Sequence, residues 1–434
     1  MKVLVINCGS SSVKYDLLSS ADGARRVGGA VTRVGATPAH HQWSDGAASF
    51  DGDVSCPSYG RALELVEEVV WRALGDPATF TARGAGGLEA VGHRVVHGGE
   101  AFTRPTLLDD AAVAAIRGCI PLAPLHNPAN VEGIERARQL FPGVPHVAVF
   151  DTSFHQTMPP EAYLYGLPYE MYEKHRVRRY GFHGPSHAYV AGEAARLLER
   201  PLEALRLVTC HLGNGSSLCA VDRGRSVDTS MGFTPLEGLL MGTRCGDLDP
   251  AIVPYLCRTL GKTPDELDAL MNRESGLLGV SGRSRDMRDL LGRAGAGDTR
   301  AALAVDIYAR RVARYVGAYA AVLGGLDGVV FTAGIGENSP EVRARVLAPL
   351  AFLGVELDPA ANDAGRGVAG RITTARSPVA ALAIPTNESL QIARDCERLL
   401  SGGGSGGGGA AAGGIGVAGG GHGVASGGAA GSAA

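Results

Sequence analysis

The 434-residue sequence predicts an α/β protein built from a duplicated unit. Two observations predict it. Strand-like apolar runs alternate with helix-like segments along most of the chain, which is typical of the α/β class. In addition, a short apolar strand runs twice into a tight turn of Gly, Asn and Ser residues, first at 3–14 and again at 207–217.

The two turns are candidate phosphate-binding sites. Gly, Asn and Ser let backbone N–H groups approach an anion closely, and the hydroxyls add donors. In the first copy Asn7 precedes the turn, and Lys14 follows it on the same face of the outgoing strand as Ser12. Two such turns predict a duplicated fold whose two domains close on one nucleotide. The alternative for the first copy is an ordinary Ser-rich hairpin with a solvated lysine.

In the first half, the segment 146–150 reads as a strand that ends in the carboxylate of Asp151. A domain boundary is expected near residue 150, because the second Gly/Ser turn lies well downstream. The strands expected in this half are 2–8, 12–18, 88–96 and 146–150, and the helices are 59–74 and 126–140.

In the second half, a hairpin is expected around the turn at 222–224, and the last helix is expected to begin after Thr386 or Asn387, which can cap it. We expect an N-terminal domain of 1–150 with about 386–400, and a C-terminal domain of 151–385. The strands expected here are 205–212, 216–221, 225–228, 327–333 and 379–384, and the helices are 298–323, 339–351 and 388–400.

The C-terminal segment 401–434 consists almost entirely of Gly, Ala and Ser. Such a composition cannot bury enough apolar surface to offset its ordering entropy, so a disordered tail is expected.

Net charge, cysteine spacing and the lack of targeting segments bear on the partners and the location to expect. A net charge of −3 and a pI of about 6.5 give no reason to expect nucleic acid or an anionic membrane surface as a partner. The eight cysteines form no C-x-x-C pair and lack zinc-site spacing, so reduced thiols are expected. No segment resembles a signal peptide or a membrane span, and a cytoplasmic location is expected.

The strand around Arg94 is a candidate carboxylate site. Alternation places Arg94 and Val96 on one face of the strand. A guanidinium beside an apolar side chain suits a small carboxylate with a short alkyl tail. The alternative is a strand arginine that pairs with a structural acid.

Four further segments carry candidate site residues. Asp151 follows a buried-looking strand, where an α/β carboxylate commonly faces the ligand crevice. His183 lies between two glycines, and Arg244 lies in the long irregular, Gly-rich stretch 228–250, which makes it a candidate second cation. At 332–338 a Gly-rich turn joins a strand to a helix, an order that suits nucleotide binding.

From residue 1 to about 397, the chain resembles acetate kinases (the acetokinase family), members of the superfamily of acetate and sugar kinases, heat-shock ATPases and actin. The resemblance rests on eight motifs in order. They are Asn7-x-Gly-Ser-Ser-Ser-x-Lys14 and the segments 92–99, 150–155, 181–184, 211–215, 231–238, 242–244 and 332–338.

The resemblance implies a duplicated ribonuclease-H-like (actin-like ATPase) fold in two domains, usually as a homodimer. It implies a phosphotransferase that converts ATP and acetate to ADP and acetyl phosphate, as in acetyl-CoA biosynthesis, with Mg²⁺ as cofactor and Mn²⁺ as a substitute. Asn7 and Glu388 would hold the metal. Arg94 would bind the acetate carboxylate.

The resemblance also assigns the remaining site residues. Asp151 would be the catalytic carboxylate, with His183 and Arg244 stabilising the transition state. The methyl pocket would consist of Val96, Leu125 and Pro235. The ATP site would consist of Lys14, His211, Leu212, Gly213, Asn214, Gly215, Asp286, Met287, Arg288, Gly334, Ile335, Gly336, Glu337 and Asn338.

Two residues depart from the family pattern: Pro185 stands where Thr is frequent, and Cys245 stands where Ser is common. Because proline lacks an N–H, a ligand contact by the backbone at 185 is not expected. Two alternative functions stay open: a propionate or butyrate kinase, and a nucleotide-switched chaperone or filament subunit of the same superfamily.

Overall fold

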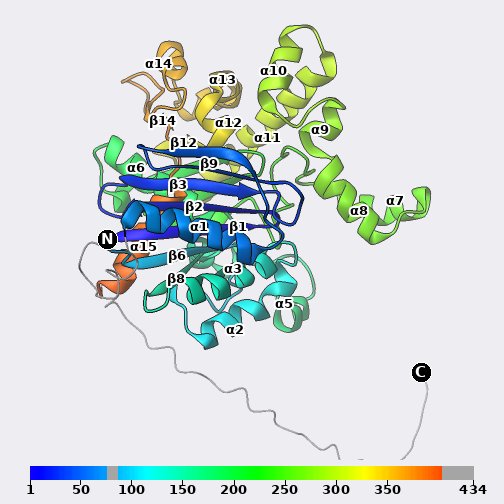
Figure 1. Cartoon of the computed structure of the whole chain (residues 1–434). Helices are drawn as coiled ribbons and strands as arrows, with labels where there is room; N and C mark the ends of the chain where they lie inside the picture. The colour runs from blue at the N-terminus through cyan, green and yellow to red at the C-terminus, as the bar shows by residue number, and fades with distance from the viewer. Residues whose placement is uncertain (76–86, 403–434) are drawn as a thin grey trace, which may run out of the picture.

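The computed structural model describes residues 1–75 and 87–402, and within these ranges the strands form two sheets, of eight and six strands (Figure 1). The predicted tail lies outside the described residues from residue 403 onward. The first sheet contains β1 (Lys2–Gly9), β2 (Ser12–Ser19), β3 (Arg25–Thr32), β4 (Ala39–Ser44), β5 (Ser49–Val54), β6 (Ala90–Val95), β7 (Thr106–Leu107) and β8 (His146–Phe150). The second contains β9 (Arg206–Leu212), β10 (Ser216–Asp222), β11 (Arg225–Thr229), β12 (Gly328–Thr332), β13 (Gly370–Arg371) and β14 (Ala380–Ala383).

Strand order confirms the duplication. The six-stranded sheet has the order β11-β10-β9-β12-β14-β13, and the eight-stranded sheet contains the matching order β3-β2-β1-β6-β8-β7. In both sheets the first three strands form an antiparallel meander, two parallel strands follow, and an antiparallel edge strand closes the set. The fold is therefore the duplicated α/β, actin-like ATPase fold that the sequence predicts.

The described part of the chain contains the following α-helices, several of which cover the two sheets. They are α1 (Tyr59–Leu74), α2 (Asp110–Gly118), α3 (Asn127–Leu140), α4 (Pro160–Tyr163), α5 (Glu170–His175), α6 (Gly184–Leu197), α7 (Ile252–Leu260), α8 (Pro264–Ala269), α9 (Gly276–Ser281), α10 (Met287–Gly295), α11 (Thr299–Val322), α12 (Ala333–Asn338), α13 (Pro340–Leu347), α14 (Pro359–Ala364) and α15 (Glu388–Leu400).

The eight-stranded sheet has a core on each face. On one face, Leu63 and Val66 of α1 pack with Leu4 and Ile6 of β1. Helix α15 covers the other face, where Ile392 and its neighbours pack against the alternate side chains of β1. Because the side chains of β1 alternate between two buried faces, the strand reads as a continuous apolar run. The predicted domain boundaries near 150 and 386 stay predictions.

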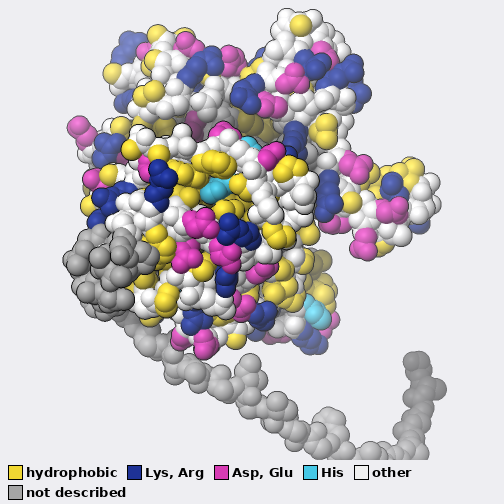
Figure 2. All heavy atoms as spheres, viewed as in Figure 1, with side chains coloured by type: hydrophobic (Ala, Val, Ile, Leu, Met, Phe, Trp, Pro, Cys, Tyr) yellow, Lys and Arg dark blue, Asp and Glu magenta, His cyan; other side chains and the backbone are white. Residues whose placement is uncertain are grey.

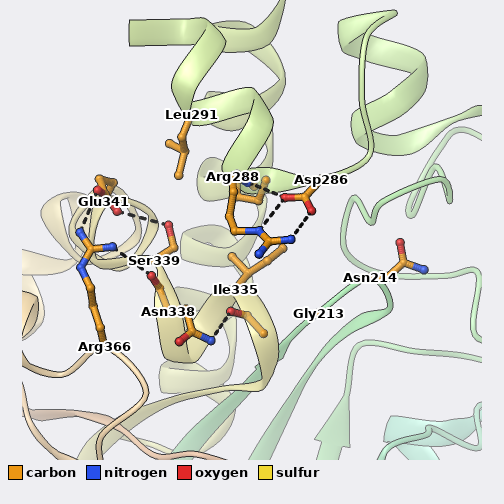
Figure 3. Close-up of a pocket in the computed structure, with 12 residues that line it drawn as sticks. Gly213, Asn214, Asp286, Arg288, Leu291, Ile335, Asn338, Ser339, Glu341 and Arg366 are labelled. Carbon is orange, nitrogen blue, oxygen red and sulfur yellow. Dashed lines mark hydrogen bonds and ion pairs between the residues drawn. The ribbon is translucent and has the colours of Figure 1, made fainter. Parts of the chain in front are cut away.

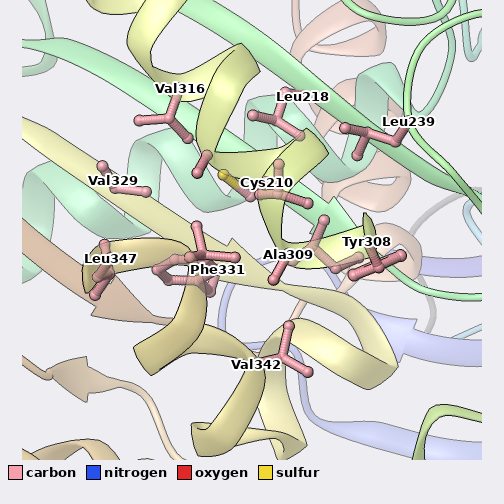
Figure 4. Close-up of a cluster of buried hydrophobic side chains, with 14 of the residues drawn as sticks. Cys210, Leu218, Leu239, Tyr308, Ala309, Val316, Val329, Phe331, Val342 and Leu347 are labelled. Atoms are coloured by element: carbon pink, nitrogen blue, oxygen red, sulfur yellow. The ribbon is translucent and has the colours of Figure 1, made fainter. Parts of the chain in front are cut away.

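The six-stranded sheet carries the largest core of the described residues. Figure 4 shows Cys210 of β9 and Phe331 of β12 beneath α11, which contributes Tyr308 and Val316. Helix α6 covers the opposite face. Helices α6 and α15 also pack on each other, so they lie between the two sheets.

Most of the expected elements form within one or two residues of their predicted ends, and α1, β8 and α15 match exactly the expected ranges. The sequence analysis gave no bounds for strands β3, β4, β5, β7 and β13 or for helices α2, α4–α10 and α14. It was also wrong about 332–338: the segment is not a turn but the short helix α12, which starts directly after β12, and its successor α13 begins at Pro340. Strand β3 begins with two arginines and has two central glycines, and β4 and β5 have only six residues each and are largely polar. Their hydrophobic periodicity is therefore weak.

Helices α7 and α8 project from the body of the molecule in Figure 1. No residue of α7 is buried, and Ile252, Tyr255 and Leu260 are exposed. Figure 2 shows basic and acidic side chains interspersed over the face in view. Among the described residues, no helix combines the length and the apolar character that crossing a membrane requires.

Candidate active site

The first Gly/Ser turn lies between β1 and β2 at the edge of a cleft. Asn7 of β1 pairs directly with Lys14 of β2, so the two side chains project from the same face of the sheet. Both line a cavity of about 360 Å³ together with Arg94 and Glu388. The structure thus brings together an amide, two cations and a carboxylate that are far apart in the sequence.

Arg94 is held by Asp151. Arg94 lies on β6, Asp151 follows the neighbouring parallel strand β8, and the guanidinium donates through Nε to Oδ1 and through Nη2 to Oδ2, both at 2.8 Å. Burial raises the pKa of Asp151, and the charge of Arg94 opposes that rise. Arg94 therefore makes the ion pair that the sequence left as an alternative. Its outer edge still faces the cleft, where Nη1 lies 3.6 Å from Glu388 Oε2.

His183 occupies a left-handed backbone position, with φ of 59°, immediately before α6. Its Nδ1 lies 2.9 Å from Ser217 Oγ, and its ring stacks on His211 at 4.1 Å between centroids and an interplanar angle of 17°. Burial lowers the pKa of His183 well below its usual value, and the neighbouring His211 and Arg94 add to this effect. The imidazole is therefore neutral at pH 7.

Arg244 lies in the segment 230–250, which forms neither helix nor strand, as the sequence predicts. Its Nη1 donates to the carbonyl of Pro235 at 3.2 Å, and none of the residues that the structure describes gives it a carboxylate partner. Burial lowers its pKa. A half-buried guanidinium without a carboxylate partner costs free energy, and a bound anion would offset that cost.

Arg244 and Arg94 line one cavity of about 260 Å³. The other lining residues are Asn7, Cys8, Gly9, Ser12, Lys14, Val96, His126, Asp151, Phe182, His183, Gly215 and Pro235. The apolar contribution comes from Val96, Phe182 and Pro235. This small cavity combines two guanidinium groups with an apolar wall, a composition that suits a short-chain carboxylate.

A separate cavity of about 570 Å³ lies over the second Gly/Ser turn (Figure 3). Figure 3 shows the Asp286–Arg288 ion pair, 2.8 Å long, on the α10 side, and Ile335 and Asn338 of α12 facing it. The lining residues are Gly213, Asn214, Asp286, Met287, Arg288, Leu291, Gly334, Ile335, Asn338, Ser339, Glu341 and Arg366. Three distant segments of the predicted ATP site therefore meet in one pocket.

Four predicted site residues do not line these cavities. The Leu125 side chain is 58% exposed, and Leu212 is buried in the core of the six-stranded sheet. Gly336 packs against the backbone of β12, and Glu337 accepts a hydrogen bond from the backbone N–H of Thr386 at 3.0 Å. Their assigned roles stay predictions. His211 and Gly215, in contrast, lie at the 360 Å³ and 260 Å³ cavities respectively.

The sequence analysis missed several lining residues. His126 and Phe182 line the smaller cavity. Phe182 lies within the motif 181–184 and His126 directly follows Leu125, so each is next to a predicted residue in the sequence. Leu291, Glu341 and Arg366 line the larger cavity. Arg366 reaches it from the segment after α14, where it pairs with Glu341 at 3.1 Å, and no local pattern predicts such a contact.

The two departures from the family pattern have simple structural settings. Pro185 lies in the first turn of α6, where a missing N–H breaks no helical hydrogen bond, and it lines a pocket that does not include Arg244. The Cys245 backbone N–H donates to the carbonyl of Met271 at 3.0 Å, and Cys245 is half-buried.

Asn7 and Glu388 suit a magnesium ion. Both supply hard oxygen donors to one cavity, and Mg²⁺ usually takes one or two protein ligands and completes its shell with water and substrate phosphates. The described residues contain no group of three or more His, Cys, Asp or Glu side chains that could hold a metal. The donor set therefore fits Mg²⁺.

Comparison with known proteins decides the family. The model of the acetokinase family matches residues 2–394. This chain belongs to the acetokinase family. It is 51% identical to an acetate kinase from Methanosarcina thermophila, over 92% of this chain and 97% of that protein. It is 49% identical to one from Thermoanaerobacter pseudethanolicus, over 93% of this chain and the whole of that protein.

Solved acetokinase-family structures have the same fold. The crystal structure of Porphyromonas gingivalis acetate kinase matches with a TM-score of 0.85 at 41% identity, covering 92% of this chain and 99% of that one. A propionate kinase from Francisella tularensis matches with a TM-score of 0.83 at 39% identity, covering 91% and 98%. The chain is an ATP-dependent phosphotransferase of the acetokinase family.

Proposed function

We propose that this acetokinase-family enzyme transfers the γ-phosphoryl group of ATP reversibly to acetate, giving ADP and acetyl phosphate. The observation that carries the proposal is the cavity of about 260 Å³ where Arg94 and Arg244 lie beside an apolar wall. It lies on the same cleft as the turn that bears Asn7 and Lys14. A small carboxylate and a phosphoryl donor can therefore meet there.

The carboxylate of acetate would bind to the outer edge of Arg94. The inner edge, Nε and Nη2, is taken by Asp151, which fixes the orientation of the guanidinium. Nη1 and the second hydrogen of Nη2 stay directed to the cleft, in the fork geometry that carboxylates accept. The methyl group would contact Val96, Phe182 and Pro235.

Charge neutralisation explains the rest of the site. Phosphoryl transfer spreads negative charge over three oxygens, so the protein acts mainly through positioning and cations. Arg244, Lys14 and the neutral His183 would contact those oxygens. Asn7 and Glu388 would hold Mg²⁺, which would supply positive charge to offset the charge of the phosphate groups. Acetate is already ionised at pH 7, so Asp151 serves to orient Arg94 and need not act as a base.

We further propose direct in-line transfer without a phosphoenzyme. Acetate is itself the nucleophile, and the carboxylate of Asp151 is occupied by Arg94. Isolation of a kinetically competent phosphorylated Asp151 or Glu388 would contradict this mechanism.

Trapping the product with hydroxylamine tests the proposed function. Acetyl phosphate reacts with hydroxylamine to give the hydroxamate, so signal is expected only when ATP, Mg²⁺ and acetate are all present. ATP hydrolysis that is independent of acetate, without hydroxamate, would contradict it and would favour a nucleotide-switched ATPase.

A propionate kinase is the second candidate, because the chain is 39% identical to the Francisella tularensis propionate kinase. One methylene in an apolar pocket changes discrimination by only about 1–3 kcal/mol. The ratio of kcat/KM values across acetate, propionate and butyrate separates the two functions, and a maximum at propionate would replace the first proposal.

We also propose a cytoplasmic homodimer. The projecting α7 exposes Ile252, Tyr255 and Leu260, and a second copy of the chain would cover such apolar side chains. Sedimentation velocity distinguishes a dimer from a monomer directly, and a monomer at all concentrations would contradict the proposal.

Replacing Arg94 should affect acetate more than ATP. Arg94→Ala removes charge-assisted hydrogen bonds worth about 1.5–3 kcal/mol, so we expect the KM for acetate to rise roughly 10- to 100-fold. The KM for ATP should change much less. Steady-state kinetics with each substrate varied in turn measures both values. An equal rise in the two KM values would contradict the assignment of Arg94 to acetate.

Replacing His183 should affect turnover. Removing one preorganised donor to the transition state costs about 10²–10³ in rate, so His183→Ala should lower kcat by that factor and leave both KM values near normal. The matched control is His175→Ala, because His175 is exposed at the end of α5 and should leave kcat unchanged. A His183→Ala enzyme with normal kcat would remove His183 from the mechanism.

A further inference from the structure

A chain of buried polar side chains leads away from His183 into the six-stranded sheet. Ser217 Oγ lies 2.9 Å from His183 Nδ1 and 2.8 Å from His187 Nε2. On the far side of its ring, His187 Nδ1 lies 2.7 Å from Thr209 Oγ1. Ser217, His187 and Thr209 are all fully buried. None of the three lines the cleft cavities, so direct contact with substrate does not explain them.

The two histidines in this series of hydrogen bonds, His183 and His187, are neutral. Burial lowers the pKa of His183 and of His187 well below the usual histidine value. A neutral imidazole carries one hydrogen, so one ring nitrogen donates and the other accepts. The Ser217 hydroxyl has no other hydrogen-bond partner among the described residues, so its one hydrogen points either to His183 or to His187. If all three contacts are hydrogen bonds, only two arrangements remain, in which the donors all point one way or all point the other.

The distances favour one direction. In the first arrangement the Thr209 hydroxyl donates to His187 Nδ1, His187 Nε2–H donates to Ser217 Oγ, and the Ser217 hydroxyl donates to His183 Nδ1. In the second, every donor is reversed, and the Thr209 hydroxyl must turn to the carbonyl of Cys219, 3.5 Å away. Both arrangements keep the three contacts of 2.7–2.9 Å, but in the second the buried hydrogen of the Thr209 hydroxyl is left with only this 3.5 Å contact. A buried donor without a good acceptor costs free energy. The first arrangement is therefore the more stable.

We propose that Thr209, His187 and Ser217 are positioning residues that hold His183 in the tautomer with its hydrogen on Nε2. Because Nδ1 accepts from Ser217, the single ring hydrogen of His183 must lie on the other nitrogen. The described residues make no hydrogen bond to that nitrogen, which borders Gly215 at the cavity that also contains Arg244. The opposite tautomer would present a lone pair to phosphoryl oxygens and repel them.

This inference rests on the proposed contact between His183 and the transferring phosphoryl group. Neutrality alone does not decide which ring nitrogen of His183 carries the hydrogen. The hydrogen bonds from Thr209 to Ser217 supply the reason why Nε2 carries it and can donate to a phosphoryl oxygen. In the first arrangement the donor is fixed before substrate binds, and such preorganisation is what makes a hydrogen bond effective in catalysis.

A pair of substitutions at Thr209 separates hydrogen bonding from packing. Thr209→Val keeps the shape of the side chain and loses the hydroxyl, whereas Thr209→Ser keeps the hydroxyl and loses a methyl group. We expect the valine variant to lose about 3- to 10-fold in kcat at unchanged KM. The serine variant should keep most of kcat although its Tm is lower. The reverse order, with serine impaired and valine normal, would overturn the proposal.

Ser217→Ala interrupts the chain next to His183 and should lower kcat by about 10-fold or more, with KM values for ATP and acetate near normal. Ser217→Thr restores a hydroxyl and should recover part of the loss. An alanine variant with wild-type kcat would overturn the proposal.

The tautomer can also be read directly, without activity. In the full-length protein labelled with ¹⁵N-histidine, the ring ¹⁵N shifts of His183, assigned by comparison with His183→Ala, report which nitrogen carries the hydrogen. We expect Nε2–H in the wild type and a larger Nδ1–H fraction in Thr209→Val. A wild-type ring protonated on Nδ1, or an unchanged spectrum in the variant, would overturn the inference. Normal kcat in His183→Ala would instead overturn the proposed function of His183.

Discussion

Asp151→Asn is expected to give one of the largest losses of activity, at least 100-fold in kcat/KM for acetate, together with a lower Tm. The carboxylate of Asp151 accepts two hydrogen bonds of 2.8 Å from Arg94, and its side chain is only 4% exposed. Asparagine has nearly the same shape but presents an NH₂ group to one of the two donors. Arg94 would then lose its counter-charge and its fixed orientation. Breaking one partner of a buried pair costs about 3–5 kcal/mol of stability.

Thermal unfolding and the hydroxamate assay measure the two effects of this substitution. Asp327→Asn is the matched control, because Asp327 accepts hydrogen bonds from Arg200 and Arg206 just before β12, at the end of that strand opposite to Thr332. The control should lower Tm and leave kcat/KM for acetate within about twofold. If Asp151→Asn lowers Tm by no more than the control and keeps its kcat/KM for acetate, the coupling of Asp151 to Arg94 has no role in catalysis.

Gly276→Ala is expected to displace Arg244 and lower kcat by about 10- to 100-fold. Gly276 has φ of 66°, and an added Cβ would lie 2.2 Å from the carbonyl oxygen of Met241 and 2.9 Å from the backbone nitrogen of Arg244. These are backbone atoms, so they cannot move without shifting the segment that carries the guanidinium. Because this segment forms no helix or strand, its position depends on such contacts.

Gly261→Ala separates backbone strain from displacement. Gly261 ends α7 with almost the same φ, 64°, but nothing lies within 4 Å of an added Cβ. Both variants should lose about 1–2 kcal/mol from the left-handed conformation. Only Gly276→Ala should also lose kcat. Equal activity of the two variants would show that the approach of Gly276 to Arg244 does not position the guanidinium.

The fold could be predicted well where its signals are local. The repeated strand and Gly/Ser turn identifies β1 and β9, and the apolar stripes of α1, α11 and α15 give their bounds within a residue. The meander β3–β5 could not be predicted in the same way, because its Gly residues and polar outer face weaken the alternation.

The site was less accessible to sequence reasoning, since its contacts join distant segments. Alternation placed Arg94 and Val96 on one face correctly. No local pattern shows, however, that Asp151 rather than a substrate takes the inner edge of Arg94, because that pairing depends on the adjacency of β6 and β8. For the same reason, the sequence gives no sign that Ser217 and His187 lie behind His183.

The contact between α6 and α15 helps to position two cleft residues relative to each other. His183 immediately precedes α6, and Glu388 is the first residue of α15, so each of these cleft residues lies at the start of a helix. The two helices pack against each other. The relative position of His183 and Glu388 therefore depends in part on the side chains at this helix contact. A change in the size of those side chains is expected to shift one helix against the other and so to alter the alignment of the two cleft residues.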